Sequence, residues 1–176
     1  MMIHEGDRDG ECARRGYGFE GVAARCFEAQ GYDTKPPANK QESIYGHVDF
    51  WARDKHGNWK SVDAKARKKL SRHDDQAQYE WTFIELKNNY GNPGWIAKGA
   101  DFMCFELEDS VLVIKRSRLH EWVMSRVDMG RHVANSREAK YCVYSREGRS
   151  DLLTLIKLSD VMDTEGLIHR VWPKTF

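Results

Sequence analysis

Residues 47–67 read HVDFWARDKHGNWKSVDAKAR, and this stretch decides the fold. Small and apolar residues alternate with polar or charged ones at both of its ends, over 48–54 and over 61–67. A period of two predicts two half-buried β-strands. Residues 55–60, which include Gly57, separate the two runs, so we expect a β-hairpin here.

Residues 55–57 form the loop of this hairpin, because Gly57 supplies the positive φ that a three-residue loop commonly needs at its end. Counting outward, Asp54 pairs with Asn58, and Asp49 falls opposite Asp63. The hairpin therefore places two carboxylates on one face of the sheet.

Lys65 falls on the same face, opposite His47. Directly opposed like charges destabilise a strand pair, so a cation should offset Asp49 against Asp63. Divalent cations such as Mg²⁺ are held by one or two carboxylates together with waters and substrate phosphate. Two alternatives stay open. Both aspartates could be solvated, with Lys65 neutralising one of them, or a register shift of one residue could turn Asp63 to the opposite face.

The arrangement resembles the PD-(D/E)XK nuclease superfamily, which has the restriction-endonuclease-like fold. Asp49 matches the first acidic position of that family, and Asp63-Ala64-Lys65 matches its (D/E)-x-K, whereas Val48 stands where proline is usual. Residues 84–123 also resemble a group of small phage-type proteins that carry this signature. The resemblance covers about 17–127 of the chain.

The resemblance implies a nuclease that hydrolyses phosphodiester bonds of DNA, either as an endonuclease or as an exonuclease. Asp49, Asp63 and the carbonyl of Ala64 would hold Mg²⁺, for which Mn²⁺ would substitute, and Lys65 would position or deprotonate the attacking water. Phosphoryl chemistry needs these features, because charge on the phosphate oxygens must be neutralised and the attacking water activated.

Many members of the superfamily add an acidic residue from the first helix, and Glu20 is the candidate here for a catalytic and metal-binding role. Apolar residues recur at helical spacing and predict an amphipathic helix over 17–30 that ends at Gly31. The alternative is that Glu20 only stabilises the first turn of the helix. Glu28 is a weaker candidate because it lies near the other end.

A second Glu-x-Lys, Glu85-Leu86-Lys87, lies in a predicted strand over 81–88. If it were the true motif, Asp63 would become the first acidic residue. We favour the hairpin assignment because local geometry brings its groups together. Glu85 and Lys87 are then either a structural ion pair or accessory residues beside the site.

Residues 65–72 carry five positive charges and follow directly from Lys65. Arg67, Lys68, Lys69 and Arg72 are therefore candidates for phosphate contacts, which give sequence-independent affinity that falls with salt. The alternative is a solvated loop. A smaller basic cluster over 115–118 is expected to open a helix with Ser117 as its N-cap.

Composition permits this function without requiring it. The 176 residues predict one domain over 1–176, with 1–15 flexible. A net charge of +1 excludes a strongly basic nucleic-acid module as a description of the whole chain. Four cysteines without CxxC spacing are typical of reduced core residues, and no apolar run is long enough to span a membrane. We expect a soluble cytoplasmic protein.

Further patterns predict a short helix over 71–79, strands over 102–107 and 111–115, a helix over 117–127, and a hairpin of 141–145 with 152–158. Together these elements predict an α/β or α+β fold, with a mixed sheet of about seven strands flanked by helices. Trp95 is either a core residue or a platform on which a base stacks.

Two other functions remain open. A catalytically inactive nucleic-acid-binding protein of the same fold would bind DNA without metal and in a salt-sensitive way. An assembly protein with aromatic faces would not bind DNA. Duplex cleavage often uses two sites, which would favour a homodimer.

Overall fold

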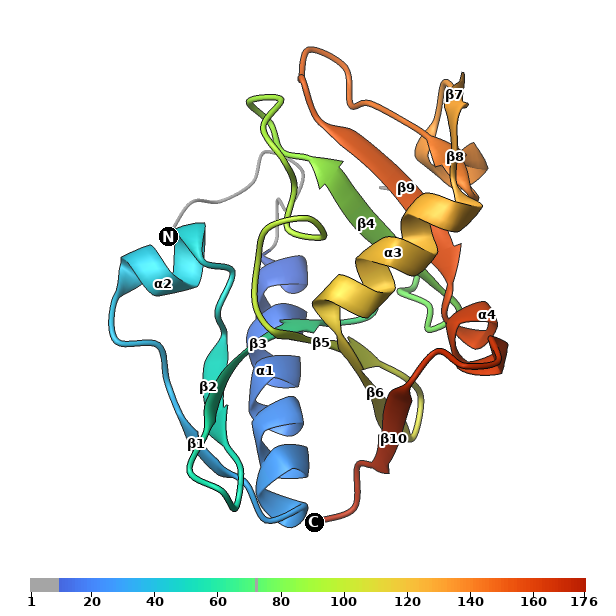
Figure 1. Ribbon diagram of the computed structural model, residues 1–176. Helices are drawn as coiled ribbons and strands as arrows, with labels where there is room; N and C mark the ends of the chain where they lie inside the picture. Colours follow the sequence, from blue (N-terminus) through green and yellow to red (C-terminus); the bar gives the residue numbers. More distant parts are fainter. Residues whose placement is uncertain (1–9, 72) are drawn as a thin grey trace.

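The computed structural model describes residues 10–71 and 73–176. Four α-helices and ten strands make up most of these residues (Figure 1). The helices are α1 (Glu11–Ala29), α2 (Lys40–Tyr45), α3 (Arg116–Arg126) and α4 (Leu158–Asp163), with a 3₁₀ turn, η1, at Ser136–Glu138. The strands are β1 (Asp33–Lys35), β2 (Phe50–Arg53), β3 (Trp59–Lys65), β4 (Trp81–Lys87), β5 (Phe102–Glu106), β6 (Ser110–Lys115), β7 (Asp128–His132), β8 (Cys142–Val143), β9 (Leu152–Lys157) and β10 (His169–Pro173).

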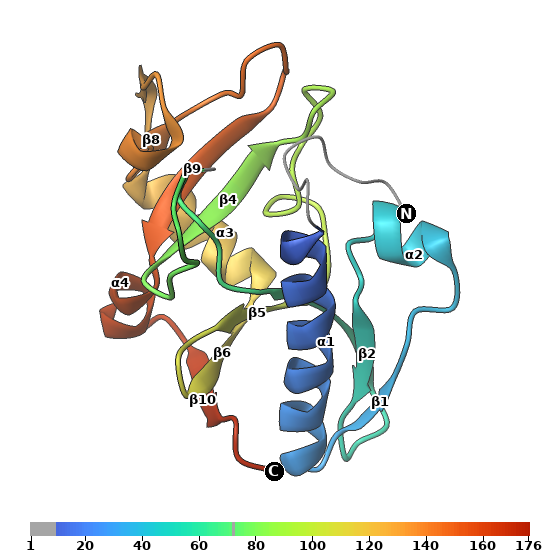
Figure 2. The ribbon, with the colours of Figure 1, turned by 180° about the vertical axis from the view of Figure 1, so that it is seen from behind.

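Six strands form the main sheet, in the order β1-β2-β3-β5-β6-β10. Neighbouring strands are antiparallel except β3 and β5, which run parallel. Figures 1 and 2 show α1 and α3 on opposite faces of this sheet. The predicted class, a mixed sheet flanked by helices, is confirmed.

Alternation along β5 and β6 divides the interior into two cores. Cys104, Val111 and Val113 face α1, where they pack with Phe19, Ala23, Cys26 and Phe27. Met103, Phe105, Leu112 and Ile114 face the other way and pack with α3, α4, β4 and β9. Each strand therefore reads as a continuous apolar run, as strands buried on both faces do. The apolar stripe predicted for the first helix is confirmed.

The expectation of a single sheet of about seven strands is wrong, because β4 leaves the main sheet. It pairs with β9 in a separate two-stranded sheet, and β7 pairs with β8 in another. Ile84 and Leu86 of β4 and Ile156 of β9 are buried in the α3-side core. The alternation in β4 predicts which face of the strand is buried but not which element covers it. Burial of this face in the α3-side core decides where the strand lies.

The first helix begins at Glu11 and not at residue 17. Arg15 forms an ion pair with Glu11 one turn away, which supports the added turns. Flexibility was expected over 1–15, of which 1–9 lie outside the described residues; residues 11–15 are helical.

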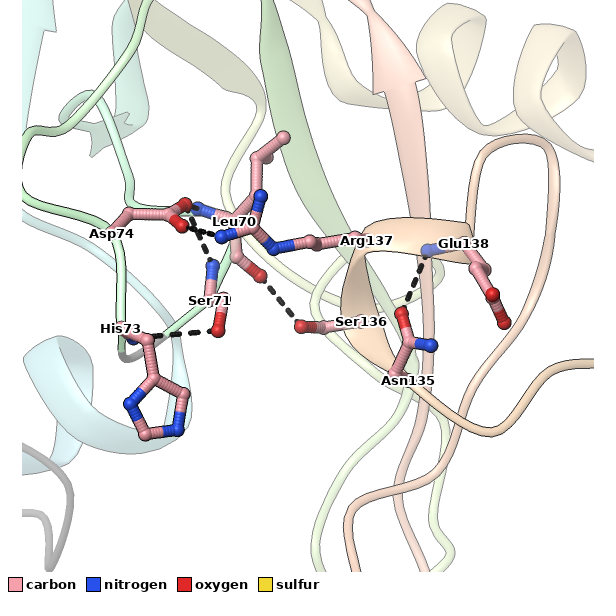
Figure 3. A network of polar contacts seen from close by, with 8 residues as sticks. All are labelled: Leu70, Ser71, His73, Asp74, Asn135, Ser136, Arg137 and Glu138. Carbon is pink, nitrogen blue, oxygen red and sulfur yellow. Dashed lines mark hydrogen bonds and ion pairs between the residues drawn. The ribbon is translucent and has the colours of Figure 1, made fainter.

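The predicted helix over 71–79 is absent from its described residues. The carboxylate of Asp74 accepts hydrogen bonds from the backbone amides of Leu70 and Ser71, at 3.0 Å each, so Asp74 closes a turn instead of continuing a helix (Figure 3). Arg137 forms an ion pair with Asp74, and Ser136 Oγ donates to the Leu70 carbonyl at 2.6 Å (Figure 3). These contacts clamp the turn to η1.

Ser117 does not cap α3, contrary to the prediction. The helix begins one residue earlier, at Arg116, and Lys115 is its N-cap without a side-chain hydrogen bond. The guanidinium of Arg116 instead donates to the backbone carbonyls of Ile96, Ala97 and Ala100, at 2.9 to 3.0 Å. Arg116 thereby joins α3 to the segment that precedes β5.

No helix among the described residues is long and apolar enough to cross a membrane. Cys26, Cys104 and Cys142 are buried free thiols.

Replacing Gly94 by alanine is expected to destabilise the protein by about 1–3 kcal/mol. An added Cβ would lie 2.1 Å from the Glu85 carbonyl oxygen, so the segment that follows β4 would have to move. Urea unfolding would measure the change.

Gly18→Ala is the matched control, because Gly18 lies within α1 with nothing within 4 Å of an added Cβ. Alanine favours the helix, so this variant should gain roughly 0.5–1 kcal/mol. Equal effects at Gly94 and Gly18 would contradict the close approach of residue 94 to β4.

Candidate active site

The β2–β3 hairpin has the predicted register. Phe50 pairs with Val62 and Arg53 with Trp59, and the Asp54 amide donates to the Asn58 carbonyl at 3.1 Å. The loop turns through Gly57, whose φ is 84°. The paired residues end at Phe50 and Val62, one step before the predicted pairing of Asp49 with Asp63.

Asp49 lies at the point where β2 leaves the ladder. Its amide still donates to the Val62 carbonyl at 2.9 Å, but the next amide, that of Val48, donates to Glu42 in α2 at 3.2 Å. The Ala64 amide of β3 donates instead to Asp49 Oδ2, at 2.7 Å. The carboxylate of Asp49 is thus held against the backbone of β3, directly beside Asp63.

Asp63 is 2% exposed, which is unusual for a carboxylate. Its Oδ1 forms an ion pair with Lys65 Nζ at 2.8 Å, and its Oδ2 is buried without a hydrogen-bond partner among the described residues. Lys65 Nζ also lies 5.1 Å from the centroid of the Trp95 ring. A buried carboxylate oxygen without a partner is costly, so the site has unmet capacity to bind a cation or a donor.

Burial and, after it, the negative charge of Asp63 raise the pKa of Asp49 to about 7. The hydrogen bond from Ala64 and the charge of Lys65 oppose this rise. The two carboxylates therefore repel each other in a poorly solvated setting.

Lys65 is a cation at neutral pH. Burial acts to lower its pKa, but the charges of Asp63, Asp49 and Glu85, with the hydrogen bond to Asp63, outweigh burial and raise it. A protonated ammonium can donate hydrogen bonds but cannot accept a proton. Of the two roles expected for Lys65, the metal-free site therefore favours positioning.

Glu20 reaches the site from α1. Burial raises its pKa, the charge of Asp63 raises it as well, and the charge of Lys65 lowers it. The weaker candidate, Glu28, accepts a hydrogen bond from Thr34 at the other end of the helix. The structure thus brings Glu20 to the aspartates and leaves Glu28 apart.

Glu85 lies at the edge of the site. Burial raises its pKa, whereas a backbone hydrogen bond from Trp95 and the charges of Lys65 and Arg146 lower it. Its Oε1 is buried without a partner in the described part of the chain. Lys87, at the end of β4, is exposed and forms no ion pair with Glu85 within the described residues. Of the two, only Glu85 lies close enough to Lys65 for their charges to interact.

Trp95 is a core residue, 6% exposed, and its ring faces Lys65 instead of solvent. His47 is not a strand residue, because its φ is 50°. Burial lowers the pKa of His47, as does the charge of Lys65, while the charge of Asp63 raises it. This histidine therefore lies near Lys65 and Asp63, as its expected place opposite Lys65 indicated, although it is not part of the strand.

The basic segment has internal partners for the side chains that are described. The guanidinium of Arg67 lies 4.9 Å from the ring centroid of Tyr79 and hydrogen-bonds its hydroxyl. Lys68 Nζ lies 3.3 Å from Cys12 Sγ, and Lys69 Nζ lies 3.4 Å from a carboxylate oxygen of Glu11. These contacts join the segment to the start of α1. Arg72, the fourth predicted contact to DNA, lies outside the described residues.

Few side chains at the site can bind a metal ion. Among the described residues, no group of three or more His, Cys, Asp or Glu side chains is arranged to hold a metal ion. Asp49 and Asp63 provide two carboxylates, and Asp63 Oδ2 is buried without a hydrogen-bond partner among the described residues. Oxygen-ligand cations such as Mg²⁺ are commonly held by one or two carboxylates with waters and phosphate, so this pair fits such an ion.

The raised pKa of Asp49 makes metal-free stability depend on pH. The folded value is about 7, and the unfolded value is about 3.9. Between these values the folded protein binds more protons than the unfolded chain, so the contribution of Asp49 is present below about pH 4 and lost as pH rises through 7. Asp49→Asn should therefore be more stable than the natural protein near pH 8, by on the order of 2 kcal/mol, with the difference shrinking towards pH 4.

Urea unfolding in EDTA at several pH values would measure this difference. Asparagine can still accept the hydrogen bond from Ala64, so the hairpin is kept. Asp109→Asn, in the exposed β5–β6 turn, is the control and should show no such trend. A variant at Asp49 that loses stability at every pH would contradict the repulsion between the two aspartates.

No protein-family model matches this chain, and no curated protein sequence matches it significantly. Among solved structures, the chain is similar to the bacterial homing endonuclease I-Ssp6803I, at 15% sequence identity and a TM-score of 0.45. The similarity covers 64% of this chain and 74% of that chain. At this TM-score the likeness is too weak to assign the chain to a family.

Proposed function

We propose that the protein is a Mg²⁺-dependent nuclease of the PD-(D/E)XK type that hydrolyses phosphodiester bonds of DNA. The observation that carries the proposal is Asp63, a buried carboxylate that lies beside Asp49, is paired with Lys65 and has one oxygen without a partner. The D…D-x-K pattern supports it, because the same three residues match the motif of that superfamily in sequence and lie together in the fold.

In this proposal Asp49, Asp63 and the Ala64 carbonyl hold the cation, and Mn²⁺ can replace Mg²⁺. The bound cation supplies a water of lowered pKa and neutralises charge on the phosphate. Neutralising the repulsion between Asp49 and Asp63 also favours cation binding, since the raised pKa of Asp49 reflects that repulsion in part.

Lys65 has the role of a fixed positive charge. Its ammonium is held by Asp63 at 2.8 Å, with the face of Trp95 behind it, so its position is set before substrate arrives. From there it can donate to the attacking water or to a phosphate oxygen, where charge develops in the transition state. Glu20 would add a third carboxylate to the groups that hold the cation.

Contacts to the DNA backbone are assigned to Lys68 and Lys69, and to Arg67 and Arg72 beside them. Cys12 and Glu11 contact the two lysines in the free protein, and phosphate would replace those contacts. Such exchange supports modest affinity that falls steeply with salt.

The decisive test compares cleavage of labelled DNA by the natural protein and by the Asp63→Asn and Lys65→Ala variants. We expect metal-dependent cleavage by the natural protein and a loss of about 100-fold or more in each variant, because each removes a charge that acts on the reacting phosphate. Linear, circular, single-stranded and branched substrates would separate endonuclease from exonuclease activity.

Lys60→Ala is the matched control for Lys65→Ala, because Lys60 is an exposed lysine of the same strand. It should cleave at the natural rate. If the natural protein binds DNA in EDTA, releases the DNA as the salt concentration rises and never cleaves it, an inactive DNA-binding protein becomes the better description.

Glu20→Gln should lower the cleavage rate about tenfold while leaving the melting temperature close to that of the natural protein. The change keeps the shape of the side chain and removes only a partly buried carboxylate whose pKa is already raised. Glu28→Gln, in the same helix but away from the aspartates, is the control. Equal rates for both variants would limit Glu20 to a structural role in α1.

A further inference from the structure

A depression of about 320 Å³ opens beside Asp49, between α1 and the β1–β2 edge of the sheet. Glu20, Asp49, Tyr17 and Pro36 are among the residues that line it. Its size is at the lower limit of sites for small ligands, which is enough for one nucleoside unit.

The depression exists because one face of α1 carries small side chains. Tyr17, Gly21 and Ala24 follow at helical spacing on that face, and a Cβ added at Gly21 would meet nothing within 4 Å. Tyr17, by contrast, is large and 64% exposed. The depression thus combines open space at Gly21 with an accessible aromatic ring one turn away, on the helix that also supplies Glu20.

The charges of the lining favour a neutral occupant. Glu20 and Asp49 are carboxyl groups, which would repel a phosphate placed among them without a cation. Lys35 also lines the depression, but its Nζ lies 4.2 Å from the centroid of the Trp59 ring and is directed to that indole. A nucleobase is neutral, has flat faces that stack on tyrosine, and has a polar edge.

β1 offers partners for such a polar edge. It is the edge strand of the main sheet and pairs on one side only, with β2. Backbone amides and carbonyls on the free side of an edge strand are available to a ligand. Thr34 and Lys35 of this strand line the depression.

We infer that this depression binds a single unpaired nucleobase next to the scissile phosphate, stacked on Tyr17, so that the protein cleaves DNA at single-stranded or frayed positions. The inference rests on the proposed function, because Asp49 and Glu20, which line the depression, belong to the proposed site of cleavage. A paired base could enter only by leaving its stack, which costs a few kcal/mol and is least costly where the base is already unpaired.

The test fills the depression without disturbing the fold. Gly21→Leu places a large side chain in the open space, and leucine is a better helix former than glycine. Gly18→Leu is the matched control, since Gly18 is an exposed helical glycine of α1 with equal room but outside the lining. Tyr17→Ala removes the aromatic ring.

The probe is a short single-stranded oligonucleotide that contains aminopurine, a fluorescent adenine analogue whose emission falls when it stacks. Its binding is measured in EDTA, where no cleavage occurs, and its cleavage is measured separately with Mg²⁺. We expect quenching with the natural protein and with Gly18→Leu, and at least tenfold weaker binding with Gly21→Leu and with Tyr17→Ala. Gly21→Leu should also lower cleavage of single-stranded relative to duplex DNA by about tenfold.

The two proposals fail in different ways. Quenching that is lost in Gly21→Leu and Tyr17→Ala supports the base-binding depression even if no cleavage is ever seen, in which case the nuclease proposal falls. Cleavage that prefers duplex DNA, or that is equal in Gly21→Leu and Gly18→Leu, overturns the inference and leaves the nuclease proposal standing.

Discussion

The repulsion between Asp49 and Asp63 is the constraint to which the centre of the molecule is fitted. Two carboxyl groups lie side by side where solvent is scarce, and the surrounding groups offset the cost: the Ala64 amide binds one, and Lys65 pairs with the other. The packing that excludes solvent comes from both faces of the sheet, through α1 on one side and β4 with Trp95 on the other. A chain selected for stability alone would place apolar residues at these positions.

The hairpin was predictable because its determinants are local. Alternation in β2 and β3 sets which side chains face the core, and a glycine at residue 57 sets the register, so a count along the chain was enough to predict the pairs from Arg53 with Trp59 to Phe50 with Val62. The strands β5 and β6 and the helix α3 were likewise evident from apolar periodicity. These elements bury whole faces, and burial dominates weaker local preferences.

What could not be predicted depends on contacts between distant residues. The sequence of β4 does not indicate that β9 is its partner. The turn at Asp74 likewise depends on an ion pair with Arg137 of η1, far along the chain. Glu20 and Glu85 were only candidates, because helical and strand patterns predict which face of an element a residue lies on but not which residues it contacts. The cations of the basic segment were expected to be solvated or bound to phosphate, whereas Arg67 and Lys69 have internal partners that no run of charges could reveal.

The parallel pairing of β3 with β5 has a consequence for the order in which the chain can fold. Antiparallel neighbours can close a short loop, but a parallel neighbour requires a crossover, and here the crossover contains β4, whose own partner is β9. During synthesis the edge of β3 that faces β5 therefore stays unpaired until β5 has emerged. The strand β4 in the crossover stays unpaired until β9 follows. The β2–β3 hairpin forms from residues close in sequence, but the strands that cover it are synthesised later. Until then its open edge is exposed to association with other chains.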